Sequence, residues 1–142
     1  MNTEVERRTY EPSTAELTFG WFHRVIALYC LLFGVLYWVR LIGIYDGPLW
    51  RFDLMPLHWQ VAAVALAAFF PFAGIGLWMM ASWGPVIWFI CAATETVMYL
   101  GFPDLFGQRW VIIASHACVV LLYLTFRLVI YFQGRREANI RQ

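Results

Sequence analysis

Lysine is absent from this sequence, and all ten of its basic residues are arginine. Charged residues of both signs make up only 13% of the 142 residues, against about 25% in an ordinary soluble domain. The net charge is +1 and no run of basic residues occurs, which excludes the basic face that a nucleic-acid-binding protein needs. The scarcity of charge also excludes an intrinsically disordered chain, because such chains combine high charge with low hydrophobicity.

Cysteine and metal-ligand motifs are scarce as well. Cys30, Cys91 and Cys118 lie in separate apolar stretches without C-x-x-C spacing, so we expect free thiols rather than disulfides or a zinc site. No H-x-x-H, H-E-x-x-H or paired-carboxylate spacing indicates a catalytic metal. A haem held by two histidines would need both at one depth, whereas His23 and His58 lie at opposite membrane edges. We therefore expect neither a metal nor a cofactor.

The sequence is rich in apolar residues instead: 62% are hydrophobic and 19% are aromatic. A membrane-spanning helix needs about 20 mostly apolar residues. Four stretches of this kind are present, at 19–44, 59–81, 85–102 and 110–132. They are continuous rather than alternating, which predicts helices and not the strands of a barrel. We expect an all-α membrane protein, one integral membrane domain over 1–142, in which four transmembrane helices form an up-down bundle between polar tails at 1–18 and 133–142.

The placement of the arginines predicts the orientation of these spans. Cytoplasmic flanks of membrane proteins carry an excess of basic residues. With both termini inside, seven arginines lie on the cytoplasmic side and two outside, while Arg40 lies within the membrane. This distribution favours an N-in/C-in topology. The longest connection, 45–58, then lies outside, and its interleaved apolar and charged residues fit either an ordered loop on the headgroups or a short interfacial helix.

Three ionisable residues lie well inside the apolar stretches. At about 1.5 Å of rise per residue, Arg40 is roughly 6 Å, Glu95 roughly 10 Å and His116 roughly 9 Å from the outer boundary of its span. Three different helices therefore place them at a similar level. Arg24 and Arg127 lie near the cytoplasmic ends of their spans, from where long side chains reach the interface.

The shared level predicts a polar cluster inside the membrane. A carboxyl group in this environment stays ionised only beside an opposite charge, so we expect Arg40 to pair with Glu95 and His116 to donate to Glu95. The cluster has either a structural role, fixing the register of the helices, or a role in binding a proton or a ligand. A third alternative is that Arg40 extends to the membrane interface on its own, without Glu95. The polar neighbours that could extend it are Tyr37, Thr94, Tyr99 and Ser115.

Two sequence segments and the polar N-terminal tail carry a resemblance to a known family. The first span opens with R-V-I-A-L-Y-C at 24–30, and the third ends with E-T-V-M-Y-L-G-F at 95–102. In these features the chain resembles an uncharacterised family of small four-span inner-membrane proteins of alphaproteobacteria. The resemblance implies a bacterial inner-membrane location, but no defined activity and no catalytic residues. The general plan is also similar to that of DoxX-like four-helix membrane proteins.

The short tails leave no room for a catalytic soluble domain, and no nucleophile–base pair or phosphate-binding loop is present. We therefore expect no enzyme, but an accessory or scaffold subunit of a membrane complex. Its environment would be the lipid bilayer, and it would bind a protein partner or a second copy through its transmembrane helices. Small residues such as Ala63 and Ala67 permit close helix contacts, either inside the bundle or between copies.

Two alternative functions follow from the intramembrane residues. The first is a small proton-linked transporter that uses Glu95, which a solvent-accessible Glu95 in a cavity would favour. The second is a quinone-binding, redox-associated subunit whose aromatic side chains and His116 would hold the quinone ring.

Overall fold

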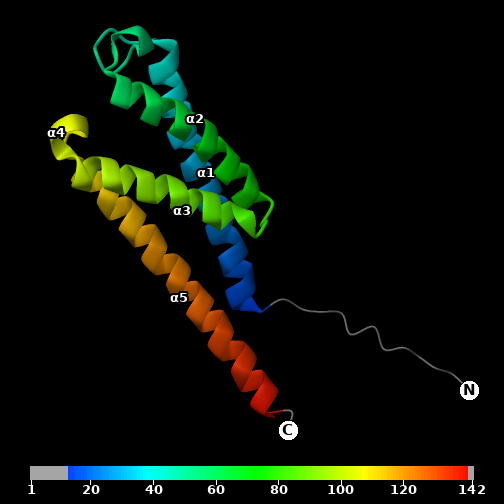
Figure 1. The fold of residues 1–142 in the computed structure, drawn as a ribbon. Coiled ribbons are helices and arrows are strands. Elements are labelled where there is room, and N and C mark those ends of the chain that lie inside the picture. The colour runs from blue at the N-terminus through cyan, green and yellow to red at the C-terminus, as the bar shows by residue number, and fades with distance from the viewer. Residues whose placement is uncertain (1–12, 141–142) are drawn as a thin grey trace, which may run out of the picture.

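The computed structural model describes residues 13–140, which Figure 1 shows in order along the chain. The helices are α1 (Thr14–Ile42), α2 (Leu57–Trp78), α3 (Trp83–Thr96), α4 (Pro103–Phe106) and α5 (Trp110–Ile140). Two shorter elements accompany them, the 3-10 turn η1 (Phe52–Leu54) and the π turn η2 (Val97–Gly101), which prolongs α3. Over the described residues the fold is helical, with no β-strand. The outer parts of the two expected tails, 1–12 and 141–142, lie outside the described residues.

Four helical segments are long and apolar enough to cross a membrane. These segments are Thr14–Ile42, Leu57–Trp78, Trp83–Gly101 and Trp110–Arg136. The predictions of an all-helical protein and of four apolar, membrane-length helices are thereby confirmed. The first helix starts upstream of position 19 because Ser13 caps it: the Ser13 hydroxyl accepts a hydrogen bond from the Glu16 N–H, and the Glu16 carboxylate accepts one from the Ser13 N–H.

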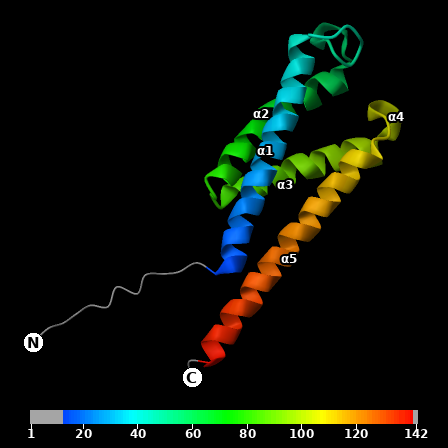
Figure 2. The same ribbon diagram turned by 180° about the vertical axis from the view of Figure 1, so that it is seen from behind.

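Helices α1 and α2 pack side by side with opposed chain directions (Figures 1 and 2). Near the loop end, the Trp38 indole N–H donates to the Ala67 carbonyl oxygen at 3.0 Å. Further along, Gly34 faces the ring of Pro71, and a Cβ at position 34 would lie only 2.6 Å from that ring. Pro71 is therefore accommodated inside α2 by the absence of a side chain on α1. Ala63 and Ala67 are buried within the chain, so this stripe of small residues is used for internal packing.

The turn from α2 to α3 depends on close contact between two glycines. A Cβ added to Gly84 would lie 2.5 Å from the carbonyl carbon of Gly76 and 2.6 Å from the backbone nitrogen of Leu77. The rings of Phe72 and Trp83 stack beside this contact, with their centroids 4.8 Å apart. The glycine contact fixes where α3 departs from α2, and α3 then runs obliquely across the α1–α2 pair (Figure 1).

The last long helix, α5, returns along α1 and α3 but is the most loosely packed of the four. The rings of Tyr123 and Phe126 lie near Phe19 at one end of α1, and Ser115 bonds Tyr29 further along, so α5 is antiparallel to α1. Only 6% of its apolar span is buried, against 33–44% in the other three. Both views show the start of α1 and the end of α5 at the same end of the molecule.

The long connection between α1 and α2 contains only the three-residue turn η1, so the alternative of an interfacial helix there is not formed. Arg51 organises this loop. Its guanidinium contacts the Asp53 carboxylate at 2.8 Å and lies 3.8 Å from Asp46. The hydrogen bond from Arg51 lowers the pKa of Asp53. The loop ion pair therefore persists as the pH falls, until the lowered pKa is reached.

Candidate functional site

Glu95 is the centre of the polar cluster, and its side chain is fully buried. It lies in the last turn of α3, directly before the π turn η2. Turns of this kind interrupt helices most often at functional sites. Helix α1 brings Tyr37 to the carboxylate and α5 brings His116, so three helices meet at one side chain.

Each oxygen of the Glu95 carboxylate has one hydrogen-bond partner. The Tyr37 hydroxyl donates to Oε1, and His116 Nε2 lies 2.6 Å from Oε2. The expected contact between His116 and Glu95 is thus present in the structure. His116 itself is only 3% exposed, and its second ring nitrogen, Nδ1, has no hydrogen-bond partner. Both members of the Glu95–His116 pair are therefore shielded from bulk water.

The expected ion pair between Arg40 and Glu95 is not formed. In the part of the chain whose side chains the structure describes, 13–136, the ion pair of Glu95 is with His116. The Arg40 guanidinium instead lies over the rings of Tyr37, Trp50 and Trp59, with its central carbon 5.0–5.5 Å from their centroids. Arg40 lies one turn after Tyr37 on α1, and the cation–π attraction of these rings stabilises its charge.

The four predicted supporting residues separate into two pairs. Tyr37 binds Glu95 directly, and Tyr99 lines a cavity beside it. Thr94 instead donates its hydroxyl to the Ile90 carbonyl oxygen of its own helix. Ser115 donates to the Ile112 carbonyl oxygen and shares a 2.8 Å hydrogen bond with Tyr29, away from the carboxylate. Thr94 and Ser115 therefore do not extend the Glu95 network.

A small polar cavity of about 90 Å³ lies beside Glu95, between α1, η2 and α5. Its polar lining comes from Tyr37, Arg40, Glu95, Tyr99 and Arg109, and Phe33, Leu36 and Ile112 complete it. Arg109 is only partly buried and lies just before α5. Two arginines and one glutamate are therefore among the residues that line the same space.

Sequence reasoning missed several residues of this region. Tyr29 and Phe33 lie eight and four residues before the predicted Tyr37 on α1 and so share one face of the helix with it, a signal that was present in the sequence. Arg109 was placed in a loop, where nothing in the sequence connects it to Glu95. The approach of Trp50 and Trp59 to Arg40 depends on how the loop folds back, which no local pattern encodes.

Glu95 and His116 are both potential metal ligands. Within the described residues, no third histidine, cysteine, aspartate or glutamate joins them in a group that could hold a metal ion. The two side chains form a hydrogen bond with each other.

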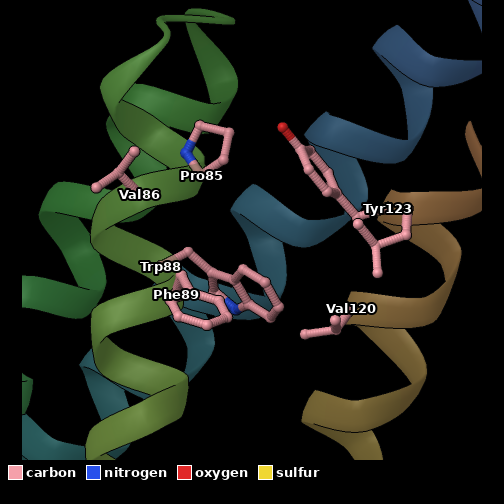
Figure 3. Close-up of a pocket in the computed structure, with 7 residues that line it drawn as sticks. Pro85, Val86, Trp88, Phe89, Val120 and Tyr123 are labelled. Atoms are coloured by element: carbon pink, nitrogen blue, oxygen red, sulfur yellow. The ribbon is translucent and has the colours of Figure 1, made fainter. Parts of the chain in front are cut away.

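A second, apolar groove of about 370 Å³ opens between α3 and α5 (Figure 3). Trp88 extends its indole across it from α3 towards Val120, and Tyr123 faces it from α5. The buried Trp88 indole N–H has no hydrogen-bond partner. His116 does not line this groove, so a quinone ring lying here would meet Trp88 and Tyr123 rather than His116.

Comparison with known proteins identifies a family but no activity. A family described as a family of unknown function, DUF6163, matches residues 17–134. The chain belongs to this family. No curated protein and no solved structure matches the chain.

The match to DUF6163 includes Tyr37, Glu95 and His116, together with both arginines of the polar cavity, Arg40 and Arg109. These residues of the candidate site thus all lie within the part of the chain that matches the family, 17–134. The prediction of an uncharacterised family is confirmed. Membership of DUF6163 indicates no particular reaction or substrate, so the function is inferred from the geometry of the site.

Proposed function

We propose that this protein is a small proton-linked carrier of the bacterial inner membrane in which Glu95 is the proton-binding group. One observation carries the proposal: the buried Glu95 carboxylate is bonded to a histidine and a tyrosine, and it borders a polar cavity. Ionisable residues at this depth are costly, and in transporters they mark the route of protons or ions. A cavity at Glu95 is the feature that favours a carrier over a scaffold.

The partners of Glu95 suit proton exchange better than permanent charge. An arginine bonded to the carboxylate would hold it ionised, because a guanidinium does not lose its proton in proteins. An imidazole can donate or accept a hydrogen bond at its ring nitrogen, and the Tyr37 hydroxyl can donate to either form of the carboxyl. The network therefore accommodates the proton on Glu95 or on His116 without a change of partner.

Infrared spectroscopy of the protein in lipid vesicles tests this proposal. Across pH about 4 to 10, which spans ordinary carboxyl and tyrosine titration, we expect a protonated-carboxyl band that disappears as the pH rises. Glu95→Gln should remove this band. Asp53→Asn is the matched control, because Asp53 is an exposed loop carboxylate and its removal should leave the band in place. If Glu95→Gln removes no pH-dependent band, the carboxyl is fixed in one state and the network is only structural.

The proposal includes the orientation in which both termini are cytoplasmic, supported by the excess of arginine near them. In a chain whose native cysteines are replaced by alanine, Asp46→Cys in the α1–α2 loop should react with a membrane-impermeant maleimide added to whole cells. Arg136→Cys, near the end of α5, should react only after the membrane is opened. The reverse pattern of labelling would contradict the orientation.

A second candidate function, an accessory subunit of a membrane complex, is supported by α5. The exposed side chains of Leu121 and Leu128 lie on the same flank of this loosely packed helix. If another helix covers this flank, Leu128→Trp should dissociate a native complex of defined mass. Leu32→Trp is the control, because Leu32 is equally exposed on α1. Equal behaviour of both variants would indicate that lipid alone covers α5.

A further inference from the structure

The polar cavity beside Glu95 contains an arginine whose hydrogen bonds are unmet. Arg40 is only 8% exposed, and its Nε and Nη1 atoms are buried without an acceptor. The three rings around the guanidinium stabilise its charge but accept no conventional hydrogen bond. A buried cation with unused donors is costly unless a partner of opposite charge approaches it. Arg40 is also one of the residues that line the cavity beside Glu95, so a partner of opposite charge bound there would lie next to this side chain.

The size and lining of the cavity limit the chemistry of that partner. About 90 Å³ corresponds to roughly three water molecules at the density of the liquid. This space accommodates a group of a few heavy atoms, but not an aromatic ring. Arg40 and Arg109 both line it, and guanidinium groups bind carboxylates and phosphates through paired N–H donors. A carboxylate or phosphate group matches both the volume and the donors.

We propose that this cavity binds the carboxylate or phosphate group of an anion between Arg40 and Arg109, and that one proton is taken up on the Glu95–His116 pair when the anion binds. The inference deepens the proposed function, on which its proton step rests, because it names the substrate class of the same site. Glu95 also lines the cavity, so an ionised carboxylate there repels an incoming anion. A proton taken from solution onto the pair cancels the added negative charge.

Other titratable or charged groups also act on the Glu95 carboxyl. From α1 these groups are Tyr29, Cys30, Tyr37 and Arg40. Its own helix and η2 contribute Cys91 and Tyr99, and the α5 side contributes Arg109 and His116. The two arginines do not exchange protons, and the tyrosines and thiols are neutral at neutral pH. The Glu95–His116 pair is therefore where an added proton is bound.

Calorimetric titration of the purified protein in dodecylmaltoside micelles tests the inference with sodium acetate and sodium phosphate as probes. Saturable binding of at least one probe is expected, and sodium chloride should not reproduce it. Repeating the titration in buffers of different ionisation enthalpy gives the number of protons taken up, which should be about one per anion. Arg40→Gln and Arg109→Gln should each weaken binding by at least about tenfold.

Arg24→Gln is the matched control for the two arginine variants. Arg24 also lies over aromatic rings, those of Trp21 and Trp78, but outside the cavity, so its loss should leave anion binding unchanged. Arg109 is partly exposed, which keeps the test decisive if Arg40→Gln fails to fold. Saturable binding of unchanged affinity in Arg109→Gln, or no saturable binding of either probe to the unsubstituted protein, would overturn the inference.

Glu95→Gln distinguishes failure of this inference from failure of the proposed function. It should retain anion binding but take up no proton. If neither probe binds while the infrared band of Glu95 still titrates, the anion site is wrong and the proton-binding site stands. If a probe binds through both arginines without proton uptake and the band does not titrate, the anion site stands alone and the proton-linked function is wrong.

The anion could be free in solution or be the headgroup of a lipid, and both present the same phosphate chemistry. Nanodiscs of phosphatidylcholine alone and nanodiscs containing phosphatidylglycerol distinguish the two. A free anion should bind in both membranes with similar affinity. If the headgroup of phosphatidylglycerol occupies the site, it should prevent acetate or phosphate from binding in the phosphatidylglycerol discs. Arg109→Gln should then weaken the headgroup's hold, so that the probe binds in these discs with the same low affinity that this variant shows in phosphatidylcholine. That pair of results would assign the site to an anionic headgroup.

Discussion

Leucine in place of His116 is expected to destabilise the protein by about 1–3 kcal/mol or more, because it leaves the fully buried Glu95 carboxyl without one of its two hydrogen-bond partners. His116 is 3% exposed and Glu95 is fully buried, and the 2.6 Å contact between them joins α3 to α5. Arg40 cannot replace the lost partner, since its guanidinium lies over aromatic rings. The measurement is the denaturant dependence of unfolding in micelles, followed by tryptophan fluorescence.

The double variant Glu95→Leu/His116→Leu should recover most of this loss. Replacing both members of a buried pair with apolar residues of similar volume is often neutral or stabilising. The Tyr37 hydroxyl then lacks its acceptor, which costs about 1–3 kcal/mol, and adding Tyr37→Phe should recover that cost as well. If the losses from the single variants simply add in the double variant, the two side chains are not coupled and the ion pair does not contribute to stability.

This cycle also separates stability from function. A stable apolar triple variant would show that α1, α3 and α5 do not need polar groups to stay together. The presence of a buried carboxyl network, which costs free energy of folding, would then need a reason other than stability, and proton binding is such a reason. The triple variant should fold, show no titrating carboxyl band and take up no proton with acetate or phosphate. A triple variant that cannot fold would instead indicate that the network holds the three helices together.

The shared level of Glu95 and His116 and the contact between them could be predicted from the sequence, whereas the surroundings of Arg40 could not. Residue counting placed Glu95 and His116 at one level because rise along a helix is fixed. The direction in which each side chain points depends on rotation about the helix axis, at about 100° per residue. Thr94 and Ser115 are adjacent in sequence to Glu95 and His116, and adjacent residues on a helix point in different directions. Tyr99 is four residues after Glu95 and therefore lies on the same face.

Arg40 shows why the predicted ion pair was wrong. The prediction paired Arg40 with Glu95 because the two residues lie at a similar level, but three aromatic rings stabilise the guanidinium instead. Two of the rings, those of Trp50 and Trp59, come from the loop and from α2, which the sequence placed only at the edge of the membrane. The loose packing of α5 was equally hidden, because an apolar helix facing lipid and one facing protein have the same composition.

Leucine in place of Gly84 is expected to disrupt the fold, and even Gly84→Ala should cost about 1–3 kcal/mol or more. The added Cβ would lie 2.5 Å from the Gly76 carbonyl carbon. Its nearest neighbours are backbone atoms of α2, so no side chain can move aside and the two helices must separate. Gly134→Ala is the control, since a Cβ there meets nothing within 4 Å.

The consequence of Gly84→Ala should extend beyond stability, because α3 carries Glu95 at its other end. A shift where α3 departs from α2 moves the carboxylate relative to Tyr37 on α1 and His116 on α5. Contacts as short as the 2.6 Å between Glu95 and His116 tolerate little displacement. We therefore expect Gly84→Ala to lower the unfolding midpoint and to shift the pH at which the Glu95 infrared band titrates. A lower midpoint with an unchanged titration would show that the α2–α3 contact and the carboxylate network are mechanically independent.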